Sequence, residues 1–538
     1  MTVSDPSTVV PRIARAAALI AVLTILARIA GFARVFVFSE TVGYTDLGSA
    51  YQTANSIPNI IFEIVAGGAL AALVVPLLAG PLDRGDRDTV AATASALLSW
   101  ALVLLVPLAV LVAVLADPLA RLLDPGKPAA EVAAAGRLLR IFAPQLPLYG
   151  IGIVLTGVLQ AYRRFAWPVL APLLSSATVI VAYLAFGALA PHRPDLAGVS
   201  RPAELVLAVG TTVGVVVLSL CLVPPVLRLG LPWRWTLRFD PALRRRLIGL
   251  AWVGVLTVAA QQVGYALTIA LVNWHTAAGA LVVLNQAQTM YLLPWAVLAV
   301  PVATSAYPAL ASASAAGDLD RFRATLARST RAVLLLSGLG AAGLATLAWP
   351  AAWVYAHVAG QPAQVPGLAR AIAAFAPGLL GYGLFALLSR ALYAHRQNRA
   401  AARATVIGWG AVAVLSVLGA LALPVGDRVA ALAGANSAGM LVLGAVLLVL
   451  VARHCGPGAL AGLGRAGGVT LLAGTLATLA GVGVRAAVPA GDAWFPVLGT
   501  AVLSGALVAL VYAAVTVLGD RPAARALLRR YRAGEGGA

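Results

Sequence analysis

The chain is built from long apolar runs separated by short breaks rich in proline, glycine and charge. A helix of about 20 apolar residues crosses the roughly 30 Å hydrocarbon core of a bilayer, and a chain of 538 residues has room for many such crossings. The runs are continuous and do not alternate with a period of two, which excludes a transmembrane barrel. With 61% hydrophobic residues, 11% charged residues and a mean hydropathy of +0.93, the sequence predicts an all-α polytopic membrane protein.

The apolar runs predict about fourteen transmembrane helices. Their ranges are 13–38, 50–80, 90–115, 132–160, 166–189, 204–228, 247–272, 278–310, 324–348, 366–393, 400–422, 429–452, 467–487 and 494–518. Basic residues concentrate in alternate loops, so the positive-inside rule places both termini in the cytoplasm. This assigns residues 1–12 and the basic tail 519–538 to the cytoplasmic side, with anionic membrane lipids as the tail's expected contact.

Several functional classes are excluded by what the sequence lacks. The net charge of +19 comes from basic residues scattered singly between apolar runs, so no nucleic-acid partner is expected. There is no phosphate-binding loop and no catalytic or metal-ligating cluster, so we expect neither an enzyme nor a cofactor. Directed transport would then draw on a monovalent ion gradient, the membrane potential or removal of the product.

The sequence repeats itself. Residues 141–163 align without gaps on residues 374–396, an offset of 233, matching Phe142 with Phe375 and Tyr149 with Tyr382. Both copies end at a basic loop, so the two halves are expected to run the same way through the membrane. We therefore predict two parallel six-helix lobes around a central cavity, a transporter architecture. The lobes are 13–230 and 247–455, joined by a basic linker at 231–246 and followed by a helix pair within 456–518.

Arg28 and Arg34 lie inside the first apolar run. Charged side chains at membrane depth cost roughly 3 kcal/mol and normally face protein or water. Six residues separate the pair, which places them about 120° apart on a regular helix, and Gly31 between them offers a bend towards one cavity. For Arg34, near the end of the run, an interfacial position is the alternative.

Polar residues also follow one face of the second predicted helix. Gln52, Asn55, Asn59 and Glu63 are spaced by three or four residues, with Pro58 among them. Interhelical hydrogen bonding alone could account for the amides, but Glu63 needs a proton or a partner, for which Arg28 and Arg34 are the nearest candidates.

The second lobe carries a weaker, uncharged counterpart of this polar face. Its members are Gln261 and Tyr265 on the seventh predicted helix, and Asn285 and Gln288 on the eighth. Pro294 falls near the position that corresponds to Pro58. The predicted cavity is therefore asymmetric, with its charge in the first lobe.

Four stretches resemble the MurJ (MviN) family of the multidrug/oligosaccharidyl-lipid/polysaccharide exporter superfamily. They are RIAGFAR at 28–34, the second helix at 49–78, FAPQLPLYG at 142–150 and GVLQAYRRFAWPVLAPLL at 157–174, and residues 292–311 are similar to the family's eighth helix. The resemblance implies fourteen helices and flipping of lipid II by alternating access. It also implies that Arg28 and Arg34 line a cationic cavity for the lipid-linked diphosphate, and that the last two helices form a groove for the polyprenyl tail.

The resemblance further implies a cytoplasmic membrane location and cell-wall synthesis or division proteins as partners. The chain departs from the family at Ile60, Ile61 and Phe62, where many members have an arginine, and at Gln288 and Thr289, where an Asp-Arg pair is usual. Two alternative functions remain open. One is export of another polyprenyl-diphosphate-linked glycan or, against the charge of the arginines, of cationic drugs. The other is a membrane scaffold that does not transport.

Overall fold

The computed structural model describes the backbone of residues 6–65, 71–191, 194–238, 241–488 and 493–519. Side chains are described in the same ranges except at 6–21, 71–73, 75–76, 241–254 and 256–257. Within this part of the chain all regular elements are helices, which confirms the all-α class. The predicted cytoplasmic tail lies outside the described residues beyond Gly519.

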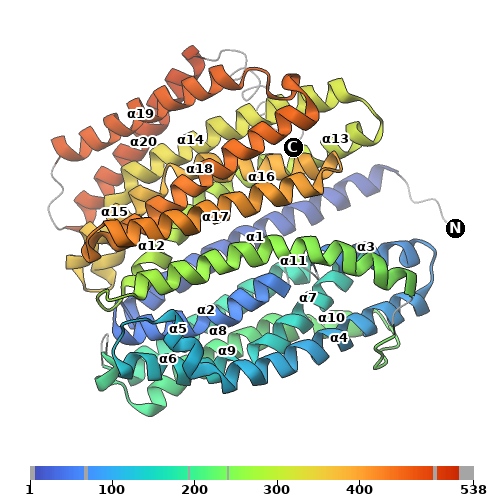
Figure 1. Ribbon diagram of the computed structural model, residues 1–538, viewed down its shortest axis with the longest axis horizontal. Helices are drawn as coiled ribbons and strands as arrows, with labels where there is room; N and C mark the ends of the chain where they lie inside the picture. The colour runs from blue at the N-terminus through green and yellow to red at the C-terminus, as the bar shows by residue number, and fades with distance from the viewer. Residues whose placement is uncertain (1–5, 66–70, 192–193, 239–240, 489–492, 520–538) are drawn as a thin grey trace. The chain divides into compact units, whose positions relative to one another are not determined.

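The helices form two compact units, Met1–Val282 with Val358–Gly360, and Val283–His357 with Gln361–Ala538. The first unit holds α1 (Pro6–Thr41), α2 (Asp46–Glu63), α3 (Ala71–Asp83), α4 (Arg87–Val114), α5 (Ala116–Leu123), α6 (Ala129–Phe142), α7 (Gln145–Ala161), α8 (Ala166–Leu189), α9 (Arg201–Leu220), α10 (Val223–Leu227) and α11 (Pro241–Asn273) (Figure 1). The boundary falls in α12 (Ala280–Pro294). The second unit continues with α13 (Val300–Ala315), α14 (Leu319–Val358), α15 (Val365–Phe375), α16 (Gly378–Ala394), α17 (Asn398–Ala422), α18 (Arg428–Cys455), α19 (Leu463–Ala487) and α20 (Trp494–Gly519).

The described parts of all fourteen predicted ranges overlap these helices, and the range 50–80 also includes residues 66–70, which lie outside the description. In the described part of the chain ten helical segments are long and apolar enough to cross a membrane, or twelve if each of two bent pairs is one span. The other two predicted ranges, 50–80 and 247–272, include residues whose positions or side chains lie outside the description. The count of fourteen therefore stays a prediction.

The sequence repeat reappears in the backbone. The bent pair α6–α7 turns by 41° and the pair α15–α16 by 42°, and their ends correspond at the same offset of 233 residues. Each copy then closes with an arginine in the left-handed region, Arg163 (φ 57°) and Arg396 (φ 58°). Since only glycine adopts this region without cost, two arginines there at equivalent positions show that the turn itself is repeated.

A second repeated turn was not recognised in the sequence. Gly85 (φ 73°) and Gly317 (φ 71°) each lie two residues beyond the end of a helix, α3 and α13, and Asp86 and Asp318 follow them. Each aspartate accepts a hydrogen bond from the backbone N–H three residues on, at 2.9 Å in both copies. The correspondence therefore extends from α3–α4 in the first unit to α13–α14 in the second.

The α11 helix packs against α2, α3 and α5 and so belongs to the first unit by its contacts. The repeat had assigned it to the second lobe. Its last residue, Asn273, is fully buried against the loop that follows α5. A polar anchor at the helix end therefore joins α11 to the first unit.

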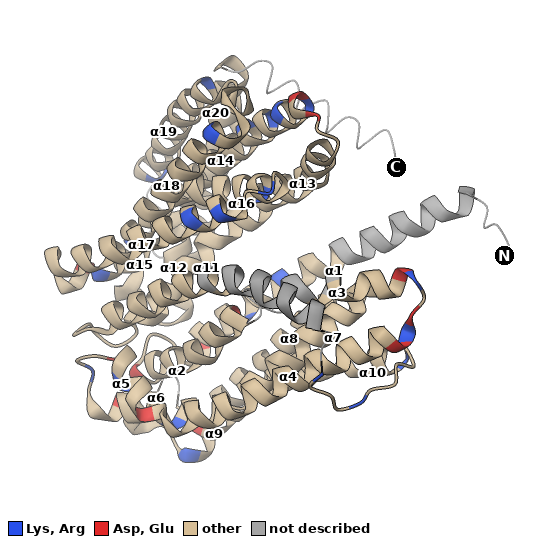
Figure 2. Cartoon of the chain, turned by 45° about the vertical axis from the view of Figure 1, so that its right-hand side comes forward, with Lys and Arg blue, Asp and Glu red and all other residues tan. Residues whose placement is uncertain are grey.

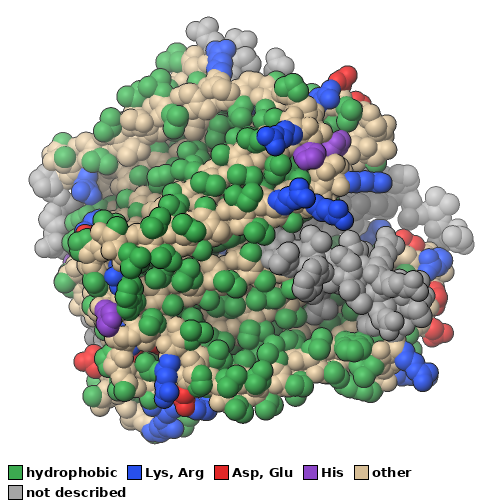
Figure 3. All heavy atoms as spheres, in the orientation of Figure 1, with side chains coloured by type: hydrophobic (Ala, Val, Ile, Leu, Met, Phe, Trp, Pro, Cys, Tyr) green, Lys and Arg blue, Asp and Glu red, His purple; other side chains and the backbone are tan. Residues whose placement is uncertain are grey.

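Each unit has its own apolar core. In the first, α3, α4 and α7 contribute Leu78, Ala94 and Val158, and in the second, α13, α16 and α18 contribute Ala303, Leu387 and Leu443. Figure 3 shows hydrophobic side chains over much of the visible surface, whereas charged residues gather near helix ends and in loops (Figure 2). This distribution is typical of helices that face lipid along their length.

Candidate functional site

Arg28 and Arg34 are both exposed on the surface of the first unit. The α1 helix continues through Gly31 without a break, and a bend there stays a prediction. Neither arginine takes part in any ion pair among the described residues. Both guanidinium groups are therefore available to an anionic ligand, from faces of α1 about 120° apart.

Arg34 lies beside a group of tyrosines. One turn further along α1, Phe38 packs against the rings of Tyr51 and Tyr183, with both centroid distances 5.3 Å. Residues four apart share a helix face, so Arg34 points to the same side, and its charge acts on Tyr51, Tyr149 and Tyr183. The sequence left an interfacial position open for Arg34, yet Arg34 is the arginine that has this polar neighbourhood.

The tyrosine group is itself held by hydrogen bonds. The Tyr51 hydroxyl lies 2.8 Å from the Tyr183 hydroxyl and 2.9 Å from that of Thr211, which fixes α2 against α8 and α9. Tyr149 of α7 donates to Asn59 Oδ1 of α2 at 3.2 Å. These bonds give the surface next to Arg34 a fixed geometry.

The polar face of α2 is only partly exposed. Gln52, Asn55 and Asn59 are half-buried, and Asn59 Nδ2 donates to the backbone oxygen of Asn55 at 2.8 Å. The helix passes through Pro58 and ends at Glu63, which is exposed. Glu63 forms no ion pair with either arginine in the described residues, so the predicted pairing is not found.

Phe62 lies near the end of α2. Its ring packs on that of Tyr149, with centroids 4.4 Å apart. The phenyl group therefore fills space beside the tyrosine group, and Arg34 supplies positive charge to the same wall.

The predicted polar residues of the second lobe are divided between the two units. Tyr265 of α11 hydrogen-bonds Ser56 of α2, so Tyr265 and Gln261 share the first unit with the α2 face. Asn285 and Gln288 are half-buried on α12 of the second unit. Sequence spacing alone could not separate these pairs.

Pro294 marks a change of helix type. A five-residue π-helical turn, Trp295–Ala299, follows it directly. Trp295 stacks on Tyr382, with centroids 4.5 Å apart, and donates from Nε1 to the Tyr382 backbone oxygen at 3.1 Å. The break therefore places an indole ring on α16, the second copy of the repeat.

Two polar features were missed in the sequence. Arg390 is a half-buried arginine in α16, and it meets the same criterion as Arg28, a charge within an apolar run. Its charge interacts with Tyr307 and Tyr393, so the second unit also carries a half-buried cation within an apolar helix. The other feature is a buried group at one end of the first unit, formed by Thr53, Asp124, Lys127, Glu131 and Asn273. In the sequence, the charged loop after the third predicted helix could have pointed to this buried group.

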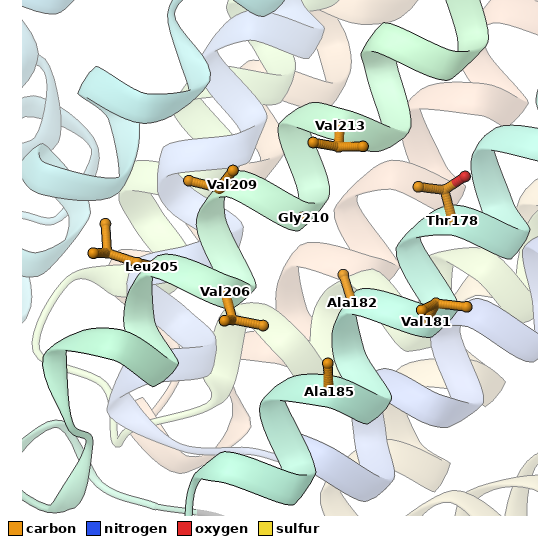
Figure 4. A pocket seen from close by; sticks show the side chains of 9 residues that line it. All are labelled: Thr178, Val181, Ala182, Ala185, Leu205, Val206, Val209, Gly210 and Val213. Atoms are coloured by element: carbon orange, nitrogen blue, oxygen red, sulfur yellow. The ribbon is translucent and has the colours of Figure 1, made fainter.

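An apolar groove of about 500 Å³ opens between α8 and α9 (Figure 4). Thr178 is the only polar side chain among those that line it, and Gly210 and Ala182 allow the two helices to approach closely. The groove is formed by two apolar spans, so it suits the hydrocarbon chain of a lipid rather than a charged group.

The fold has counterparts among solved structures. A structure titled lipid II flippase MurJ, in an inward closed conformation, superposes with a TM-score of 0.73 and covers 93% of this chain and 98% of that one, at 19% identity. An inward-facing multidrug resistance transporter of the MATE family matches with a TM-score of 0.66 over 80% of this chain and 94% of its own, at 14% identity. At these identities the matches establish the fold.

Sequence comparison identifies the family. The chain is 27% identical to the lipid II flippase MurJ of Burkholderia cenocepacia, covering 69% of this chain and 71% of that protein. It is 23% identical to the probable lipid II flippase MurJ of Rickettsia prowazekii, covering 73% and 75%. The family model described as "Lipid II flippase MurJ" matches residues 38–497. A match over most of the chain, together with the transporter fold, shows that this multi-pass bacterial membrane protein belongs to the MurJ family.

Proposed function

We propose that this protein flips lipid II across the cytoplasmic membrane by alternating access, with Arg34 and Arg28 holding the diphosphate. Membership of the MurJ family and the names of its relatives support the substrate. One observation supports this site: both guanidinium groups are exposed and form no ion pair with a carboxylate in the described residues. Of the two, Arg34 lies beside the tyrosine group.

The chemistry of a diphosphate fits this arrangement. A diphosphate that leaves the headgroup water needs cations, and a planar guanidinium binds two phosphate oxygens at once. Asn55 and Asn59, half-buried on α2, lie on the same wall as Tyr149 and offer amide groups to the neutral parts of the headgroup. We assign Arg34 the main contact and Arg28 a second one.

The orientation and the path of the tail are part of the proposal. Basic residues in alternate loops support cytoplasmic termini. The polyprenyl tail is assigned to α19 and α20, which pack on α14 through Ala342, Ala473 and Val508 and expose large apolar side chains such as Leu472 and Val502.

A translocation assay on purified protein in liposomes tests the proposal. With lipid II placed in one leaflet, the wild type should expose it in the other, with and without an imposed membrane potential. Loss of a charge-assisted hydrogen bond costs about 1.5–3 kcal/mol, so Arg34→Gln should slow flipping by about tenfold or more, and Arg34→Lys by less.

The matched control is Arg164→Gln, an exposed arginine in the loop after α7, which should flip at the wild-type rate. Equal flipping rates for Arg34→Gln and the wild type would show that Arg34 does not bind the diphosphate. If the protein moved another polyprenyl-diphosphate glycan and did not move lipid II, the proposed substrate would be wrong.

A further inference from the structure

A polar group is buried where α2, the α5–α6 loop and the end of α11 meet. Asp124 is 2% exposed, and Thr53 and Asn273 are fully buried. Asp124 Oδ1 accepts hydrogen bonds from Thr53 Oγ1 at 2.8 Å and from Asn273 Nδ2 at 2.6 Å. Asn273 Nδ2 also donates to the Leu123 backbone oxygen at 3.0 Å. One carboxyl oxygen therefore joins three segments that are far apart in the sequence.

The other oxygen of this carboxyl has no partner. Asp124 Oδ2 is buried and accepts no hydrogen bond from the described residues, and the same holds for Asn273 Oδ1. An ionised oxygen in such a place is costly, because no donor from the described residues compensates for its charge. The geometry therefore favours a neutral carboxyl, with a proton on Oδ2.

The surrounding charges do not neutralise an ionised Asp124. Lys127 donates to the backbone oxygens of Thr276 and Ala277, both at 3.2 Å, and pairs with Glu131 at 3.6 Å. Glu131 of α6 is 3% exposed, and Asp46 of α2 adds a further negative charge acting on it. His275 of the α11–α12 loop packs against Gly126. Lys127 is thus already engaged by Glu131 and by two carbonyl groups.

We propose that Asp124 is a proton-binding site that fastens α11 to α2 and to the α5–α6 loop. With the proton bound, Thr53 and Asn273 donate to a neutral carboxyl and no charge is buried. When the proton leaves, a negative charge remains inside the junction beside Glu131, and separation of α11 from α2 becomes easier because it admits water to Oδ2. Under the proposed orientation the site faces the extracytoplasmic side.

The acid–base behaviour of the site supports this reading. Asp124 lies between two spans, and burial raises its pKa from 3.8 to about 7, with Glu131 adding to the rise while Thr53, Lys127 and Asn273 oppose it. In an open junction the carboxyl meets water and its pKa returns towards the ordinary value. Between about pH 4 and pH 7 the closed junction therefore binds the proton that the open one has lost, so each rise of one pH unit weakens closure about tenfold.

Hydrogen exchange on the full-length protein in nanodiscs tests the site. After correction for the intrinsic exchange rate, amide protection in segments 121–131 and 269–277 should fall by about tenfold per unit between about pH 5 and pH 7. Asp124→Asn, which keeps an acceptor oxygen, should make protection independent of pH. Asp117→Asn, an exposed carboxylate paired with Arg140 on the neighbouring helix, should keep the wild-type dependence.

A second variant and a spectroscopic measurement keep the proposal testable if Asp124→Asn does not fold. Thr53→Val removes a donor that favours the ionised form, so the midpoint should move to higher pH. Infrared difference spectra should show a neutral carboxyl band at about pH 5 that disappears by about pH 8 and is missing in Asp124→Asn. Protection that does not vary with pH in the wild type, or a band unchanged by Asp124→Asn, overturns the proposal. Neither readout requires lipid II, so a failure of flipping leaves the proton site standing.

Discussion

The two copies of the repeat, α6–α7 and α15–α16, have the same backbone and different side-chain surroundings. Their bends of 41° and 42° and their left-handed arginines agree closely. In the first copy, however, Tyr149 donates to Asn59 and packs on Phe62, whereas in the second its counterpart Tyr382 stacks on Trp295. The comparison shows that the two bent pairs share one backbone geometry. The first copy places its tyrosine among polar groups, and the second places it among aromatic rings.

Gly157 and Arg390 occupy equivalent positions in the two copies. Exchanging them is expected to have the largest effect on stability. A Cβ at Gly157 would collide with the Val74 side chain of α3, so Gly157→Arg should destabilise the first unit by about 3 kcal/mol. Arg390→Gly only replaces a half-buried side chain by a poorer helix former, at about 1 kcal/mol. Thermal unfolding in detergent measures both. Equal losses would show that the copies pack more alike than these contacts indicate.

A smaller effect should separate the two tyrosines. Tyr149→Phe removes a hydrogen bond worth about 1 kcal/mol and should slow lipid II flipping by about fivefold. Tyr382→Phe keeps the ring that stacks on Trp295 and should stay within about twofold of the wild type. Both are compared in the liposome assay. The contrast between a polar and an aromatic copy fails if the two variants slow flipping equally.

The smallest effect concerns the repeated helix starts at Asp86 and Asp318. Each carboxylate caps a helix, so Asp86→Ala and Asp318→Ala should lower Tm slightly and by similar amounts at neutral pH. Hydrogen bonds from Thr89 lower the pKa of Asp86, so its cap is complete above the ordinary pKa and is lost as the pH falls through the lowered value. The Tm of Asp86→Ala should therefore approach that of the wild type in acid. A difference in Tm that persists there, or a loss for only one of the two variants, would break the equivalence of these turns.

Much of this architecture could be read from the sequence, because helix-forming apolar runs and a gapless alignment are local signals. The described parts of all fourteen predicted ranges overlap helices, and the aligned copies end at equivalent residues. The exposed position of Glu63, which forms no ion pair within the described part of the chain, and the place of α11 in the first unit depend on tertiary contacts. Asp124 and Asn273 are 149 residues apart, so no local pattern could have joined them.

Arg163 and Arg396 have opposite effects on local folding and on membrane insertion. A left-handed arginine costs roughly 1–2 kcal/mol that glycine would avoid, so each turn closes less readily than it could. During synthesis, however, a positively charged loop is retained on the cytoplasmic side as the flanking helices enter the bilayer. Glycine at both turns would ease local folding and weaken the signal that orients four helices. Under the proposed orientation, the chain keeps at these two positions a residue that favours a cytoplasmic loop, although glycine would fit the turn better.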